Sequence, residues 1–180
     1  ILVLLKNILF NFQTGIFYKI LRTKLGLIYN VGMSPDIDIM NSKASYYFLY
    51  TQCEEKNLPL LISEIIKILS TYKITNKDIS DAKNRNKVSY ENKKFYDLTS
   101  YNDDYKTHML HNKKFISNEE YFKMVDNISA NDVKDFYDTF KKDILSKGIL
   151  FYYSRKNINK SIDKYVKKSV IKNKYKMLYI

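Results

Sequence analysis

The segment from Leu21 to Met33 reads LRTKLGLIYNVGM and joins a helix to a strand. Gly15 to Lys24 carries apolar residues at the spacing of one helical face. Gly26 follows, and glycine often ends a helix because it adopts the left-handed conformation without strain. Leu27 to Met33 is then rich in β-branched and aromatic residues, as strands are. The segment therefore predicts a helix that stops at Gly26 and a strand that follows it.

A second strand is predicted from Ala44 to Cys53 (ASYYFLYTQC), which has the same strand-forming composition. The turn formers Ser34, Pro35 and Asp36 separate it from the first strand. We therefore expect Leu27 to Met33 and Ala44 to Cys53 to be neighbouring antiparallel strands.

Helices are expected before and after this strand pair. Ile1 to Phe10 (ILVLLKNILF) reads as a helix, and Pro59 opens another. The helix at Pro59 has an apolar stripe at the i, i+3, i+4, i+7 spacing of a core-facing side, which consists of Leu58, Leu61, Ile62, Ile65 and Leu69.

Three further helices start with the same kind of cap. In each, an Ile precedes a Ser or Thr N-cap, an acidic residue stands at the third helical position and an apolar residue at the fourth. This pattern combines a capping box with a hydrophobic staple. The three starts are Ile74-Thr75-Asp78-Ile79, Ile116-Ser117-Glu120-Tyr121 and Ile128-Ser129-Asp132-Val133.

The end of the chain completes an α+β pattern. The last capped helix has an apolar face, Gly148 introduces a strand, and a lysine-rich helix closes the chain. These elements are the face with Val133, Phe136, Tyr137 and Phe140, the strand Ile149 to Ser154 and the helix Ile158 to Val170. An antiparallel sheet with helices packed on one face is the fold class that we predict.

The composition is that of a globular chain. With 180 residues, 45% of them hydrophobic and 28% charged, we expect residues 1–180 to form a single domain. No stretch reaches the roughly 18 apolar residues of a membrane span, and no signal peptide is evident. The single cysteine, Cys53, excludes a disulfide framework and favours a reducing intracellular compartment. Because the chain starts in mid-helix with Ile1 instead of Met, we expect a fragment of a longer chain.

Lysine dominates the charge. The formal net charge is +12, and only Arg22, Arg85 and Arg155 of the 31 basic residues are arginine. Proteins that read nucleic acids favour the planar fork of arginine, and an AT-rich coding sequence also enriches lysine on a solvated surface. We therefore do not expect nucleic acid as a partner. A lysine-rich module that binds anionic surfaces or nucleic acid stays open as a further alternative function, and it requires lysines clustered on one face.

The segment from Leu21 to Val31 resembles the C-terminal, non-zinc half of the insulinase/pitrilysin family of zinc metallopeptidases, which includes the mitochondrial processing peptidases. In that family a helix ends in a pattern close to Leu-Arg-x-Lys-x-Gly-Leu-x-Tyr-x-Val, and Arg22 and Tyr29 have its seven-residue spacing. Two later landmarks agree with the family in order, namely Ile74 to Lys83 (ITNKDISDAK) and Ile128 to Val133 (ISANDV).

The resemblance implies a LuxS/processing-peptidase-like metallohydrolase fold that lacks its first strand and first helix here. It implies that Tyr29 donates a hydrogen bond to the substrate carbonyl oxygen as charge develops there, and that Arg22 holds a substrate carbonyl or carboxylate. The family's zinc motif, His-x-x-Glu-His, is absent from this sequence. We therefore expect no cofactor in this chain, zinc in the missing half, and no activity of this chain alone.

The partners implied by the resemblance are a zinc-bearing N-terminal half, or a homologous subunit, and a peptide bound along a strand edge. The resemblance also leaves a mitochondrial location open. It equally permits a catalytically inactive scaffolding subunit derived from such a peptidase.

Individual residues also have plainer interpretations. His108 and His111 are spaced to share a helical face, but no Glu lies between them and no third ligand is evident, so we expect no metal site. Cys53 at the end of an apolar strand reads as a small core residue instead of a nucleophile. The alternative for Tyr29 is an aromatic packed on the sheet, and for Arg22 a charge that complements its helix dipole.

Overall fold

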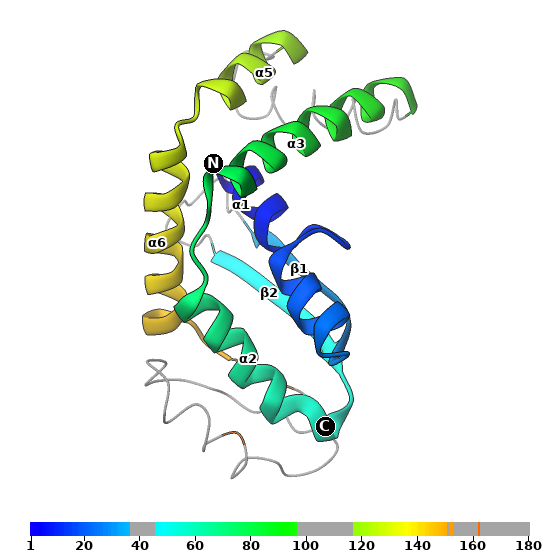
Figure 1. Ribbon diagram of the computed structural model, residues 1–180, viewed down its shortest axis with the longest axis vertical. Helices are drawn as coiled ribbons and strands as arrows, with labels where there is room; N and C mark the ends of the chain where they lie inside the picture. Colours follow the sequence, from blue (N-terminus) through cyan, green and yellow to red (C-terminus); the bar gives the residue numbers. More distant parts are fainter. Residues whose placement is uncertain (37–45, 97–116, 151, 153–161, 163–180) are drawn as a thin grey trace.

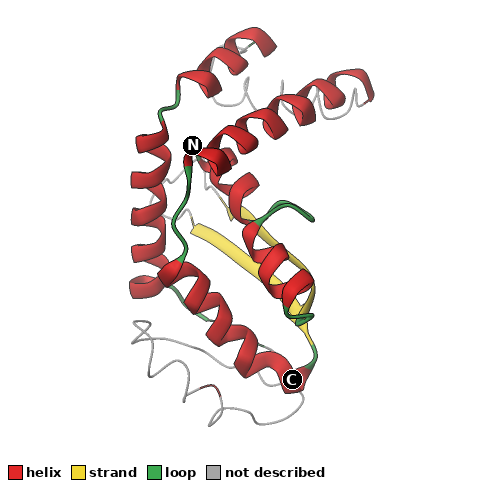
Figure 2. Cartoon of the chain, in the orientation of Figure 1, coloured by secondary structure: helices red, strands yellow, loops and turns green. Residues whose placement is uncertain are grey.

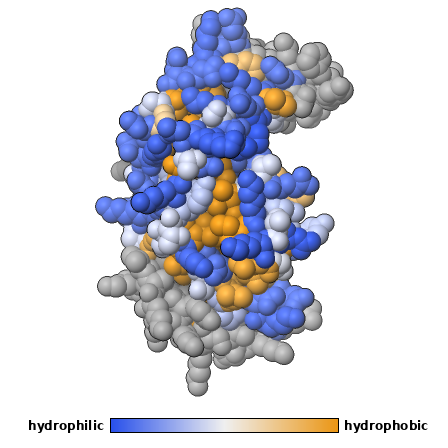
Figure 3. Space-filling view, viewed as in Figure 1, coloured by the Kyte–Doolittle hydropathy of each residue, from blue (hydrophilic) through white to orange (hydrophobic). Residues whose placement is uncertain are grey.

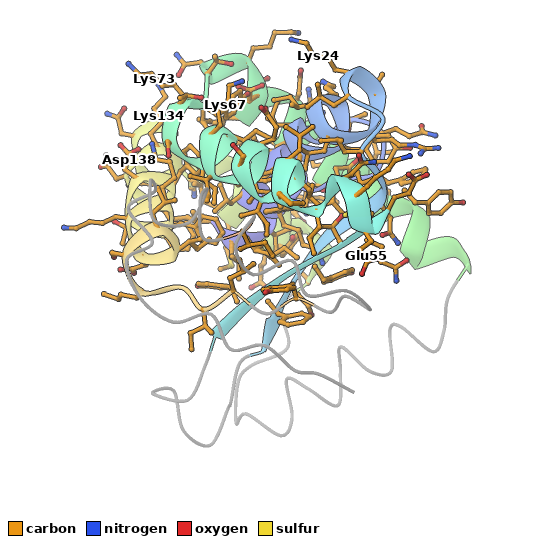
Figure 4. All side chains as sticks on the ribbon, turned by 90° about the horizontal axis from the view of Figure 1, so that it is seen from below. Lys24, Glu55, Lys67, Lys73, Lys134 and Asp138 are labelled. Carbon is orange, nitrogen blue, oxygen red and sulfur yellow. The ribbon has the colours of Figure 1, made fainter. Side chains whose placement is uncertain are left out.

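The computed structural model describes residues 1–36, 46–96 and 117–150, together with residues 152 and 162. Within them, two strands form one antiparallel sheet, and helices lie on one side of it (Figures 1 and 4). The fold is α+β, as predicted. Residues 151, 153 and 154 of the predicted strand Ile149 to Ser154 lie outside the described residues, as does the predicted helix Ile158 to Val170 except for Ile162.

Two helices precede the sheet, as predicted. Helix α1 (Leu2–Leu9) buries its apolar face, and η1 (Tyr18–Lys24) follows it as a π-helix. The sequence predicted a helix for the second segment but not its wider π-helical turn. The buried residues of the two helices are Leu4, Leu5, Ile8, Leu9 and Leu21.

The sheet consists of β1 (Ile28–Asp36) and β2 (Tyr46–Cys53), which pair antiparallel, so the predicted strand pair is confirmed. The predicted turn at Ser34 to Asp36 is wrong, because β1 continues through Pro35 and Asp36 opposite the start of β2. Proline is tolerated near the end of a strand in a two-stranded sheet, where its missing N–H need not break a ladder of hydrogen bonds. Turn-forming residues therefore did not decide where this strand ends.

The remaining helices follow the sheet in the order 3₁₀-helix η3 (Glu55–Asn57), α2 (Leu58–Thr71), α3 (Asn76–Tyr96), α5 (Asn118–Asn127) and α6 (Ala130–Lys147). The three predicted N-caps are confirmed. The side-chain oxygens of Thr75, Ser117 and Ser129 accept hydrogen bonds from backbone N–H groups three residues later, at distances of 3.1–3.2 Å. Figure 2 shows that these helices make up most of the described chain.

One cluster of buried side chains joins the sheet to the helices. It includes Met33 from β1 and Val133 from α6, which are 1% and 0% exposed. The predicted stripe of α2 contributes as expected, since Leu61 and Leu69 are buried in the cluster and Leu58 and Ile65 pack at its margin. Figure 3 shows hydrophilic residues over the flanks of the molecule and apolar residues along the middle of the helix side.

Candidate functional site

The end of η1 positions the predicted site residues. Gly26 has a φ of 63°, which is the left-handed conformation that glycine adopts without strain. Its N–H donates to the carbonyl oxygen of Arg22 at 3.0 Å, and the N–H of Leu27 donates to that of Leu21 at 2.8 Å. This cap turns the chain back, so that the start of β1 lies against the last turn of η1.

The structure brings Arg22 and Tyr29 together. Arg22 lies in the last turn of η1 and Tyr29 on the strand that follows, as the sequence predicted. The Arg22 Nη1 donates a hydrogen bond of 3.0 Å to the carbonyl oxygen of Ile28. The Arg22 Cζ also lies 5.5 Å from the centre of the Tyr29 ring, which is within cation–π distance. Both side chains are exposed, and Tyr29 is 73% exposed.

A β-bulge at Tyr29 and Asn30 sets the direction of the tyrosine. The pairing register shifts between Ile28 and Val31, and the hydroxyl of Thr51 donates to the carbonyl oxygen of Asn30 at 2.6 Å. A bulge re-aims side chains, and here Ile28 is buried while Tyr29 faces solvent. The spacing of the inward residues Ile28, Val31 and Met33, which is three and then two, was the available sequence signal for this bulge.

The arrangement offers two kinds of hydrogen-bond donor at one exposed place. A guanidinium has five N–H donors, so the bond from Arg22 to Ile28 does not exhaust them. The phenol of Tyr29 supplies an O–H donor at the surface. Together they suit a polar, acceptor-rich ligand such as a peptide backbone or a carboxylate.

Cys53 lies opposite Ile28 in the sheet and packs half-buried against the core cluster. Burial raises the pKa of its thiol, and the neighbouring Glu54 carboxylate raises it further. Since the thiolate is the nucleophilic form, this environment supports the interpretation of Cys53 as a small core residue.

No group of three or more His, Cys, Asp or Glu side chains in the described part of the chain is placed to hold a metal ion. His108 and His111 lie outside the described residues. None of the described helices is both long enough and apolar enough to span a membrane.

Comparison with known proteins gives a family match over part of the chain and a similar fold. Residues 1–86 match the family described as "Peptidase M16 inactive domain". No curated protein matches the sequence. Among solved structures, a conserved protein from Enterococcus faecalis V583 resembles this chain with a TM-score of 0.58 and 17% sequence identity, over 76% of this chain. The chain spans 32% of the length of that protein. The resemblance of this sequence to the inactive, non-zinc half of the M16 metallopeptidases is thereby confirmed over residues 1–86.

Proposed function

We propose that this chain is the substrate-binding half of a zinc metalloendopeptidase, and that a separate half bears the zinc. Two observations support this. Residues 1–86 match an inactive M16 domain, and Arg22 and Tyr29 meet at the exposed junction of η1 and β1. The contact between Arg22 and Tyr29 carries the proposal, because the resemblance implies that these two residues bind the substrate.

Each residue has a distinct proposed role. The Arg22 guanidinium binds a substrate carbonyl or carboxylate through its fork of donors, while its bond to Ile28 fixes the side chain. The Tyr29 phenol donates a hydrogen bond to the scissile carbonyl oxygen, and this bond strengthens as the oxygen becomes negatively charged. Zinc held by the other half would polarise the same carbonyl.

Peptide binding by the chain itself tests this proposal. We expect a dye-labelled, unstructured peptide to bind the chain, and Arg22→Gln to weaken binding about tenfold through loss of a charge-assisted contact. Lys24→Gln is the matched control, since Lys24 is exposed in the same turn of η1. Fluorescence anisotropy measures both affinities, and equal effects of the two substitutions would contradict the role of Arg22.

A scaffolding subunit is the second candidate function. The hydrogen bond from Arg22 to Ile28 favours a scaffold, because an arginine with a purely structural role would also hold the first residue of β1 in this way. A scaffold would pair with the zinc-bearing half but bind no peptide. The same anisotropy experiment therefore separates the two candidates.

The distribution of charge on the surface argues against the third candidate, a lysine-rich binding module. Lysines of α2, α3, α5 and α6 lie beside carboxylates at 2.6–3.6 Å. Figure 4 shows Lys67, Lys73 and Lys134 on separate elements, with the acidic Asp138 on the same flank as Lys134. Mixed charges of this kind are typical of a solvated surface.

A further inference from the structure

The two faces of the sheet differ in character. Met33 of β1 and Leu49 of β2 pair across the sheet and face the core, and Met33 is 1% exposed. Because side chains alternate along a strand, the neighbours of Leu49 point to the other face. Those neighbours are Phe48 and Tyr50, which are 51% and 47% exposed. The outer face of the sheet therefore presents two large rings to solvent.

The two rings form one continuous surface across both strands. Phe48 and Tyr50 are stacked, with ring centres 6.1 Å apart and planes inclined at 26°. The Tyr50 ring also lies over Gly32, its partner on β1, so closely that a Cβ at position 32 would collide with it. Glycine at this position thus lets the tyrosine lie flat across the neighbouring strand.

The outward residues opposite the two rings are uncharged, and they lie on the same strand as Tyr29. Between Tyr29 and Ser34 on β1 and between Phe48 and Gln52 on β2, the outward residues carry no formal charge; they are Tyr29, Gly32, Ser34, Phe48, Tyr50 and Gln52. Tyr29 and Gly32 are three residues apart, which is about 10 Å along a strand. An extended peptide has the same rise per residue, so a peptide held at Tyr29 would bring a side chain about three residues further along to the two rings.

We propose that Phe48 and Tyr50 form a subsite that selects an aromatic or aliphatic side chain of an extended peptide. This inference rests on the proposed function, since it assumes that the peptide is held at Arg22 and Tyr29. The exposed rings and the uncharged outward residues opposite them, Gly32 and Ser34, favour an apolar side chain over an acidic or basic one. The substrate class is therefore an unstructured peptide with an apolar anchor.

Two dye-labelled peptides that differ only in Phe or Ser at the anchor position test the subsite. We expect wild-type chain to bind the Phe peptide about tenfold more tightly, and the double variant Phe48→Thr, Tyr50→Thr to bind both peptides equally. Threonine keeps the strand propensity, and circular dichroism checks folding. Phe12→Thr is the matched control, because Phe12 is exposed but outside the sheet, and it should keep the preference.

The outcomes separate the subsite from the function on which it rests. If wild-type chain binds both peptides equally, or the double variant keeps its preference, the subsite is wrong and the proposed function stands. If wild-type chain binds neither peptide, both are wrong. If analytical ultracentrifugation shows a wild-type dimer that the double substitution dissociates, the rings instead form an interface between copies of this chain. If the double variant does not fold, the single variants Phe48→Thr and Tyr50→Thr take its place, and an unchanged preference in both would contradict the subsite.

Discussion

The Nζ of Lys83 lies 2.6 Å from the carbonyl oxygen of Ile128, so a lysine of α3 caps the end of α5 although the two residues are 45 positions apart. The same ammonium group donates to the carbonyl oxygen of Asp126 at 2.8 Å. Lysines near a helix C-terminus satisfy carbonyl groups that have no partner within the helix. Lys83 therefore connects α3 to the corner between α5 and α6.

Replacement of Lys83 by Met should loosen this corner. We expect the free energy of unfolding to fall by about 2 kcal/mol, because two charge-assisted hydrogen bonds are lost at a half-buried place. Urea denaturation measures the change, and hydrogen exchange should show faster opening of α5. Lys77→Met is the control, since the exposed pair of Lys77 with Asp81 contributes little. Equal effects at the two positions would show that Lys83 does not connect these helices.

Asp78 should make stability depend on pH. Burial would raise the pKa of its carboxyl, but hydrogen bonds from Thr75 and Tyr72 and the charge of Lys19 outweigh burial and hold the pKa below its ordinary value. The stabilisation is then present above the unfolded pKa of about 4 and is lost as the pH falls through the lower folded pKa. Asp78→Asn should cost about 1 kcal/mol at pH 7 and less at pH 3.

Urea denaturation of wild type and Asp78→Asn at both pH values checks this prediction. Asp81→Asn serves as the control, because its carboxylate lies in an exposed pair with Lys77 at 3.6 Å. A difference between wild type and Asp78→Asn that grows on acidification would have the wrong sign and would contradict the mechanism.

Tyr137 and Tyr72 should respond in opposite ways to loss of their hydroxyl groups. The buried Tyr137 hydroxyl has no hydrogen-bond partner among the described residues, whereas the Tyr72 hydroxyl donates to Asp78 at 2.8 Å. Tyr137→Phe should leave the free energy of unfolding unchanged or raise it by up to about 1 kcal/mol. Tyr72→Phe should lower the free energy of unfolding by about 1 kcal/mol, and urea denaturation measures both changes. A loss of stability in Tyr137→Phe would point to a buried water bonded to that hydroxyl.

Gly32 and Tyr50 should be strongly coupled. Gly32→Ala places a methyl group against the Tyr50 ring and should cost about 1–3 kcal/mol of unfolding free energy. In a Tyr50→Ala background the same change should be neutral or slightly stabilising, because alanine loses less conformational entropy than glycine. A double-mutant cycle by urea denaturation measures the coupling. Additive effects would mean that the ring does not lie over Gly32 in solution.

If this chain is half of an active peptidase, as proposed above, Tyr29 and Arg22 should affect different kinetic constants. Tyr29→Phe should lower kcat about a hundredfold, or about 3 kcal/mol, since the deleted hydrogen bond strengthens only in the transition state. Arg22→Lys should mainly raise KM, because lysine cannot reproduce the fork that holds the substrate. Tyr47→Phe is the control, as that ring packs edge-on against Phe140 at 5.6 Å. Equal losses of kcat in Tyr29→Phe and Tyr47→Phe would contradict the proposed role of Tyr29 at the site.

Local chemistry explains which parts of this fold the sequence predicts. The caps at Thr75, Ser117 and Ser129 were predictable because each depends on residues within one turn. The helix stop at Gly26 was predictable for the same reason. Each strand was predictable from its own β-branched and aromatic residues. The extension of β1 through Pro35 was not, because it depends on the partner strand and not on the turn propensity of the segment itself.

In the candidate site, too, local features were predictable from the sequence and features that depend on tertiary packing were not. The helix stop at Gly26 predicted Arg22 in the last turn of a helix and Tyr29 on the next strand, and both placements are confirmed. The contact of the guanidinium with Ile28 and the Tyr29 ring depends on the π-helical turn and the bulge. Both are departures from regular geometry that tertiary packing selects, so a pattern based on regular periods does not reveal them.

The core cluster described above also bears on how this protein can be divided. Val133, Tyr137 and Phe140 of α6 are buried in the same cluster as Leu5 of α1 and Leu69 of α2. The family match ends at residue 86, well before α6 begins. A chain cut at that point would expose the parts of α1 and α2 that pack against α6. We therefore expect the segment that carries the family signature to need α6 in order to fold, so that recombination between relatives would have to transfer both together.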